Sequence, residues 1–67
     1  MIEDIDIWRC AHLLIQQHGD GAEFDAAMRA DAMMAKGDVA GEAVWKRVLA
    51  AIRELQRTQP KEGEPAN

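Results

Sequence analysis

The sequence contains one cysteine, so a disulfide bond within the chain is impossible. A lone thiol in a chain without any other cysteine is typical of a protein kept in a reducing compartment. No apolar run approaches the length of a membrane helix, about 20 residues, and the first residues, MIEDIDIW, are acidic where a secretion signal is basic. We therefore expect a cytoplasmic protein that makes no contact with a membrane.

Basic residues are also scarce, because eight lysines and arginines stand against twelve aspartates and glutamates, for a net charge of −4. A phosphate-binding surface is normally basic, so nucleic acid is disfavoured as a partner. Four basic residues nevertheless gather on the outer side of the helix predicted at 38–57: Lys46, Arg47, Arg53 and Arg57. Glu42 and Glu54 lie among them, a mixture typical of a solvated helix face. Weak nucleic-acid binding through this side remains an alternative.

Strand-forming patterns are missing, since no run of β-branched residues alternates with polar ones. Apolar residues recur instead at helical spacing, which predicts helices at about 4–18, 20–36 and 38–57. Connections this short favour near-antiparallel neighbours. We expect an all-α domain at 1–57, folded as a three-helix bundle, and a disordered, polar, proline-containing tail at 58–67.

The two predicted connections contain the same pair of residues, Gly19-Asp20 and Gly37-Asp38. Glycine ends a helix readily because it enters the left-handed conformation without steric cost. An aspartate after it can accept the free N–H groups of the next helix. Asp20 with Glu23 resembles a capping box, and Asp4 is the expected N-cap of the first helix.

Each predicted helix has an apolar side that we expect to face the core. The first helix carries Ile5, Trp8, Ala11, His12 and Ile15 on this side, with Ile7, Leu14 and His18 beside them. The second carries Phe24, Ala27, Met28, Met34 and Ala35, with Ala30 and Ala32 at the margins, and the third carries Val44, Trp45, Val48, Leu49, Ala51, Ile52 and Leu55. Cys10 and Leu13 lie off the stripe of the first helix, which is therefore apolar on more than one side. Gly41 lies on the inward side of the third helix and suggests the close approach of a ring, Phe24 or Trp8.

Asp31 interrupts the apolar stripe of the second predicted helix. A carboxylate buried at such a position costs several kcal/mol unless it is paired or hydrogen-bonded. We interpret Asp31 as a structural polar residue of the core that accepts a hydrogen bond from a tryptophan, a histidine or Arg9. A site carboxylate with a raised pKa is the less favoured alternative.

No constellation of residues indicates catalysis, a cofactor or a metal. His12 and His18 are six residues apart, which does not bring two imidazoles together on a helix, and Cys10 adds no zinc-binding pattern. No histidine lies three or four residues from Cys10 to activate its thiol. Gly19-Asp20-Gly21 lacks the further glycines and the lysine of a phosphate loop. We expect a protein that is not an enzyme.

Several short elements resemble a family of short uncharacterised bacterial proteins, a domain of unknown function. They are Asp6-Ile7-Trp8-Arg9, His18-Gly19, Ala30-Asp31, Gly37-Asp38, Gly41, Trp45-Lys46-Arg47 and Ala51-Ile52. The resemblance covers about 4–56 and leaves out the tail. It implies a small helical fold and a bacterial origin, and it provides no catalytic residues.

The apolar surplus of so short a chain predicts a protein–protein interaction module, and a homodimer is its simplest form. The candidate interface residues are Trp8, Leu13, Met33, Trp45, Lys46 and Arg47. Two alternatives stay open. One is a small regulatory or inhibitory factor that acts on a nucleic-acid-handling complex, and the other is the weak nucleic-acid binder described above.

Overall fold

A computed structural model describes residues 3–58 and is helical almost throughout, with no strand in that range. Helix α1 spans Asp4–His18, the short 3₁₀ helix η1 spans Gly19–Gly21, α2 spans Ala22–Ala35 and α3 spans Val39–Thr58. The predicted all-α class is confirmed. The tail predicted at 58–67 lies outside the described residues, except for Thr58, which ends α3.

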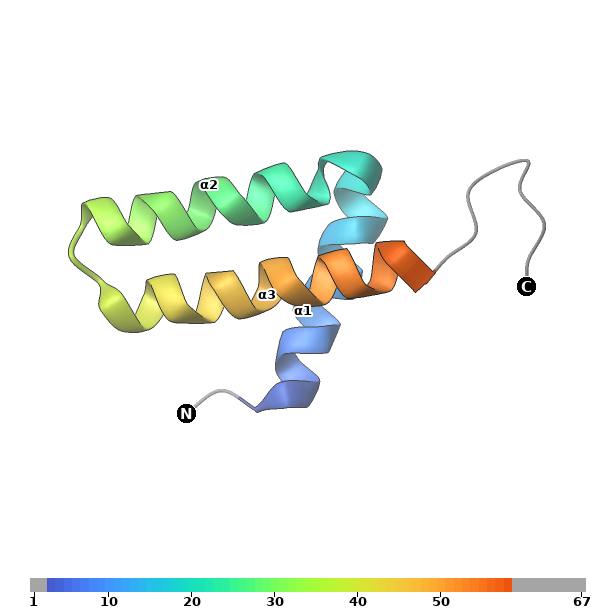
Figure 1. Cartoon of the computed structure of the whole chain (residues 1–67), viewed down its shortest axis with the longest axis horizontal. Helices are drawn as coiled ribbons and strands as arrows, with labels where there is room; N and C mark the ends of the chain where they lie inside the picture. The colour runs from blue at the N-terminus through green and yellow to red at the C-terminus, as the bar shows by residue number, and fades with distance from the viewer. Residues whose placement is uncertain (1–2, 59–67) are drawn as a thin grey trace.

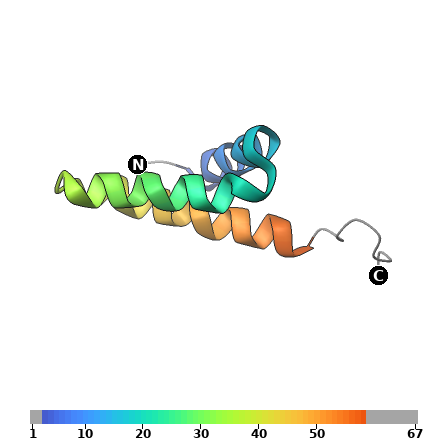
Figure 2. The ribbon, with the colours of Figure 1, turned by 90° about the horizontal axis from the view of Figure 1, so that it is seen from above.

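Helices α2 and α3 run side by side in opposite directions, and α1 crosses one face of this pair (Figures 1 and 2). The short loop 36–38 therefore produces the antiparallel neighbours that its length predicts. The connection through η1 does not produce antiparallel neighbours, because the chain turns at η1 and α2 then crosses the direction of α1. The fold is best described as a helical hairpin with a crossing helix.

Glycines end the first two helices as the sequence predicts. Gly19 has a φ of 55° and Gly37 a φ of 78°, and no non-glycine residue among those described has a positive φ. After Gly37, the Oδ1 atom of Asp38 accepts a hydrogen bond of 2.8 Å from the backbone N–H of Gly41. Asp38 is thus confirmed as the N-cap of α3.

The other two predicted caps are wrong. Residue Asp20 lies inside η1, and α2 begins only after Gly21, without a side-chain cap. The N-cap of α1 is Glu3, also without a side-chain hydrogen bond. Asp4 pairs instead with Arg47 of α3. At Asp4 a salt bridge replaces the local capping bond, and at Asp20 a 3₁₀ turn replaces it. Neither replacement can be predicted from sequence spacing.

The core lies where the three helices meet, and it is small. Nine apolar residues among those described are buried: Ile7, Ala11, Leu14, Ala22, Ala26, Ala30, Val48, Ala51 and Ile52. Five of the nine are alanines, so each contributes little apolar area. The inward face predicted for α3 is largely confirmed, since Val48 and Ile52 are fully buried and Val44, Trp45, Leu49 and Leu55 pack around them.

The inward face predicted for α2 is wrong. Its buried residues are Ala22, Ala26 and Ala30, at intervals of four, whereas Phe24, Met28 and Met34 are 70%, 55% and 56% exposed. Small side chains let the axes of two helices approach closely. The pair α2–α3 is therefore built on alanine, and the large side chains of α2 point to solvent.

Helix α1 is likewise turned relative to the prediction. Ile7, Ala11 and Leu14 are buried, while Ile5, Trp8 and His12, which were predicted to face the core, are exposed. At Gly41 a Cβ would lie 2.9 Å from the sulfur of Met33, so the close neighbour is this thioether and the Asp38 carboxylate, not an aromatic ring. None of the helices in residues 3–58 combines the length and hydropathy needed to cross a membrane.

Candidate interaction surface

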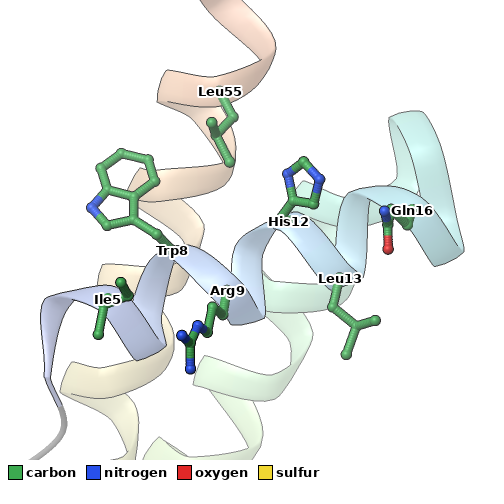
Figure 3. A pocket seen from close by; sticks show the side chains of 7 residues that line it. All are labelled: Ile5, Trp8, Arg9, His12, Leu13, Gln16 and Leu55. Carbon is green, nitrogen blue, oxygen red and sulfur yellow. The ribbon is translucent and has the colours of Figure 1, made fainter.

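An open groove of about 610 Å³ runs along the outer side of α1. Its lining residues are Ile5, Trp8, Arg9, His12, Leu13, Gln16 and Leu55. Six of them come from α1 at intervals of three and four residues, the spacing of one helix face. Figure 3 shows them along the helix, with Leu55 reaching the same groove from α3. We call this surface the α1 groove.

The α1 groove is apolar and open to solvent. Ile5 is 58% exposed, Trp8 43% and Leu13 52%. Isolated apolar side chains on a surface are ordinary, but several together in one hollow mark a binding surface. Tryptophan is the residue type that most often dominates binding energy. Trp8 and Leu13, both predicted from the sequence as interface residues, are both exposed and line the two edges of this surface.

Arg9 is the only charged residue that lines the α1 groove, and among the described residues no carboxylate lines it. The guanidinium of Arg9 makes no ion pair or side-chain hydrogen bond with any residue in 3–58. An unpaired cation within an apolar hollow favours a ligand that has both apolar side chains and a carboxylate.

A second exposed apolar surface covers the side of α2 that faces away from α3. Its members are Phe24, Met28, Asp31, Met34 and Ala35. We call this surface the α2 outer face. Asp31 is exposed, and no charged side chain among the described residues is buried, so its interpretation as a polar core residue is wrong. The carboxylate does interrupt an apolar stripe, but the stripe faces solvent.

The other predicted interface residues do not line the α1 groove, although Arg47 lines a second hollow together with Trp8. Met33 is half-buried against Gly41 inside the hairpin instead of pointing outward. Trp45 is also half-buried, and the guanidinium carbon of Arg29 lies 5.1 Å from its ring centroid, within the range of a cation–π contact. Both residues are thus less exposed than Trp8 and Leu13.

The basic side of α3 is neutralised by acidic partners. Lys46 pairs with Glu42 at 2.9 Å and Arg53 with Glu23 at 2.9 Å. Arg47 pairs with Asp4, and Arg57 pairs with Glu54. Such exposed pairs add little to stability, but each places a negative charge beside the positive one. Each of these four cations therefore has a carboxylate as its neighbour.

Residues with reactive or metal-binding side chains are scattered. Among residues 3–58 no group of three or more histidine, cysteine, aspartate or glutamate side chains could hold a metal ion. Cys10 is a half-buried free thiol, and His12 lines the α1 groove.

Comparisons of the chain with models of protein families, with curated proteins and with solved structures give no match. The function is therefore inferred from the α1 groove and the α2 outer face. The sequence pointed to Trp8 and Leu13 as interface residues, which stays a prediction, and it did not single out Arg9 or the α2 outer face. The apolar excess of α1, on more than one side, was the signal that pointed to the groove.

Proposed function

We propose that the chain is a small, non-catalytic protein–protein interaction module that binds its partner through the α1 groove. The observation that carries this proposal is that Ile5, Trp8, Leu13 and Leu55, from two helices, line one open hollow. A patch of this kind is costly to leave in water, and a protein partner would remove it from solvent.

The small alanine-rich core adds support for association. A chain of this size rarely gains more than about 3–5 kcal/mol from its own core. A partner that binds only the folded state increases that stability by mass action. A homodimer is the simplest source of such a partner, since it needs no second protein.

The nucleic-acid alternatives receive less support from the geometry. Lys46, Arg47, Arg53 and Arg57 are each paired with a carboxylate. A regulatory or inhibitory factor that acts on a nucleic-acid-handling complex would instead use the same α1 groove to contact a protein of that complex. The resemblance to a bacterial family of unknown function stays a prediction.

Photo-crosslinking tests the proposed function directly. We expect a photoreactive amino acid at Leu13, in the α1 groove, to form discrete protein adducts in the native cell. The matched control places the same amino acid at Ala43, which is exposed on α3. Adducts at Leu13 that are absent at Ala43, identified by mass spectrometry, support the module. Equal or absent crosslinking at both positions would contradict it.

A further inference from the structure

The two exposed apolar surfaces of the chain have matching patterns. In the α1 groove, Ile5, Arg9, His12 and Gln16 follow each other at intervals of four, three and four residues. On the α2 outer face, Phe24, Met28, Asp31 and Ala35 follow at the same intervals. Each surface is thus one stripe of about three helical turns, and the side chains of two such stripes can interdigitate.

The charges on the two surfaces are opposite, and neither has a partner among residues 3–58. Of the described residues that line the α1 groove, only Arg9 carries a full charge, and Asp31 interrupts the α2 outer face. Neither forms an ion pair or side-chain hydrogen bond with another residue in 3–58. Within one chain these surfaces lie mainly on two different helices, α1 and α2, which run in crossing directions (Figure 1).

Pairing each surface with its own copy is unfavourable. Two α1 grooves face to face would bring two Arg9 side chains into one apolar interface, with no carboxylate from either lining. Two α2 outer faces would do the same with two Asp31 carboxylates. Like charges desolvated together oppose association by several kcal/mol. Only contact between the α1 groove and the α2 outer face joins a cation to an anion.

We propose that the occupant of the α1 groove is the α2 outer face of a second copy of this chain, with Asp31 of one copy opposite Arg9 of the other. The inference rests on the proposed function and specifies its partner. The ion pair fixes the register of the two helices: with the helices antiparallel, Met28 then lies opposite His12, and Ala35 lies opposite Ile5. A contact between two different surfaces closes into a ring or continues as a chain of copies, according to the rotation between neighbours.

Charge exchange tests this pairing on the full chain by sedimentation equilibrium. We expect Arg9→Glu and Asp31→Lys each to weaken self-association at least about tenfold, because each places like charges opposite one another. In the double variant Arg9→Glu/Asp31→Lys the pair is restored with its signs exchanged. Its dissociation constant is expected to return to within about threefold of the native value, a coupling that only a direct contact produces.

Two matched controls carry the same changes of charge elsewhere. Lys36→Glu copies the change at Arg9, and Asp20→Lys copies the change at Asp31. Both positions are exposed and outside the two surfaces, so we expect association to change less than about threefold. Thermal melts of all variants confirm that the fold is retained.

Two results would overturn the inference. One is a double variant that associates no better than the single ones, and the other is a native chain that stays monomeric at high micromolar concentration. If Leu13 then still crosslinks to a different protein, the proposed function stands and only the identity of the partner is wrong. If Leu13 forms no adduct and the chain is monomeric, both proposals fail.

Discussion

Replacement of Ile52 by alanine is expected to leave most of the chain unfolded in dilute solution at 25 °C. Ile52 is fully buried and belongs to the cluster where all three helices meet. Removing its buried carbons and leaving a cavity costs about 2–5 kcal/mol. Because the total stability of a domain of this size is about 3–5 kcal/mol, the loss is comparable with the whole. Urea denaturation followed by circular dichroism measures it.

The control is the same substitution at Ile5, which is 58% exposed. Ile5→Ala is expected to change the free energy of unfolding by less than about 0.5 kcal/mol, since exposed substitutions rarely do more. Both variants are compared at one low protein concentration, so that association does not contribute. Equal losses at the two isoleucines would show that the core has been placed wrongly.

The second large effect is expected at Ala26, which is fully buried on α2. Ala26→Leu forces a large side chain between closely packed helices, and we expect a loss of about 1–3 kcal/mol. Phe24→Ala, two residues away, is expected to be nearly neutral. Phe24 is 70% exposed, and alanine favours a helix more than phenylalanine does. Thermal and urea denaturation of both variants give the comparison.

The opposite result would identify the alternative arrangement of α2. If Phe24 faced the core, as its position in the apolar stripe predicts, its truncation would cost about 3–5 kcal/mol. Ala26 would then lie near the surface and accept leucine without loss. The two substitutions together therefore decide which side of α2 faces α3.

Much of the local structure could be predicted from the sequence, because it depends on the chemistry of single residues. Gly19 and Gly37 adopt positive φ angles, and Asp38 caps α3 with a side-chain hydrogen bond. The apolar arc predicted for α3 is also confirmed. The opposite side of α3 is charged, so only one rotation of the helix buries its apolar side chains, and Val48 and Ile52 are fully buried.

The rotation of α2 could not be predicted in this way, because both of its sides are apolar. One side carries Ala22, Ala26 and Ala30, and the other carries Phe24 and Met28. Hydrophobicity alone favours the burial of the larger side chains, Phe24 and Met28. Tertiary packing decides otherwise, since alanines allow α2 and α3 to approach closely along their length. The wrong prediction that Asp31 lies in the core follows from the same rotation of α2.

The α1 groove was predicted only in part, because the rotation predicted for α1 was also wrong. Leu13 lay off the stripe expected to be buried, so its exposure was anticipated. Arg9 was considered only as a partner for Asp31 inside one chain, because α1 was expected to turn Ile5 and Trp8 inward. Once Ile7, Ala11 and Leu14 occupy the core, Trp8 and Arg9 come to the outer side together.

We infer that Trp8 lies on a surface that is open in one chain and covered by association. Acrylamide quenching of Trp8 fluorescence in a Trp45→Phe variant tests it most directly, because Trp8 is then the only tryptophan. We predict strong quenching in dilute solution, decreasing as the protein concentration rises through the dissociation constant measured by sedimentation. Quenching that stays constant across that range would contradict the claim.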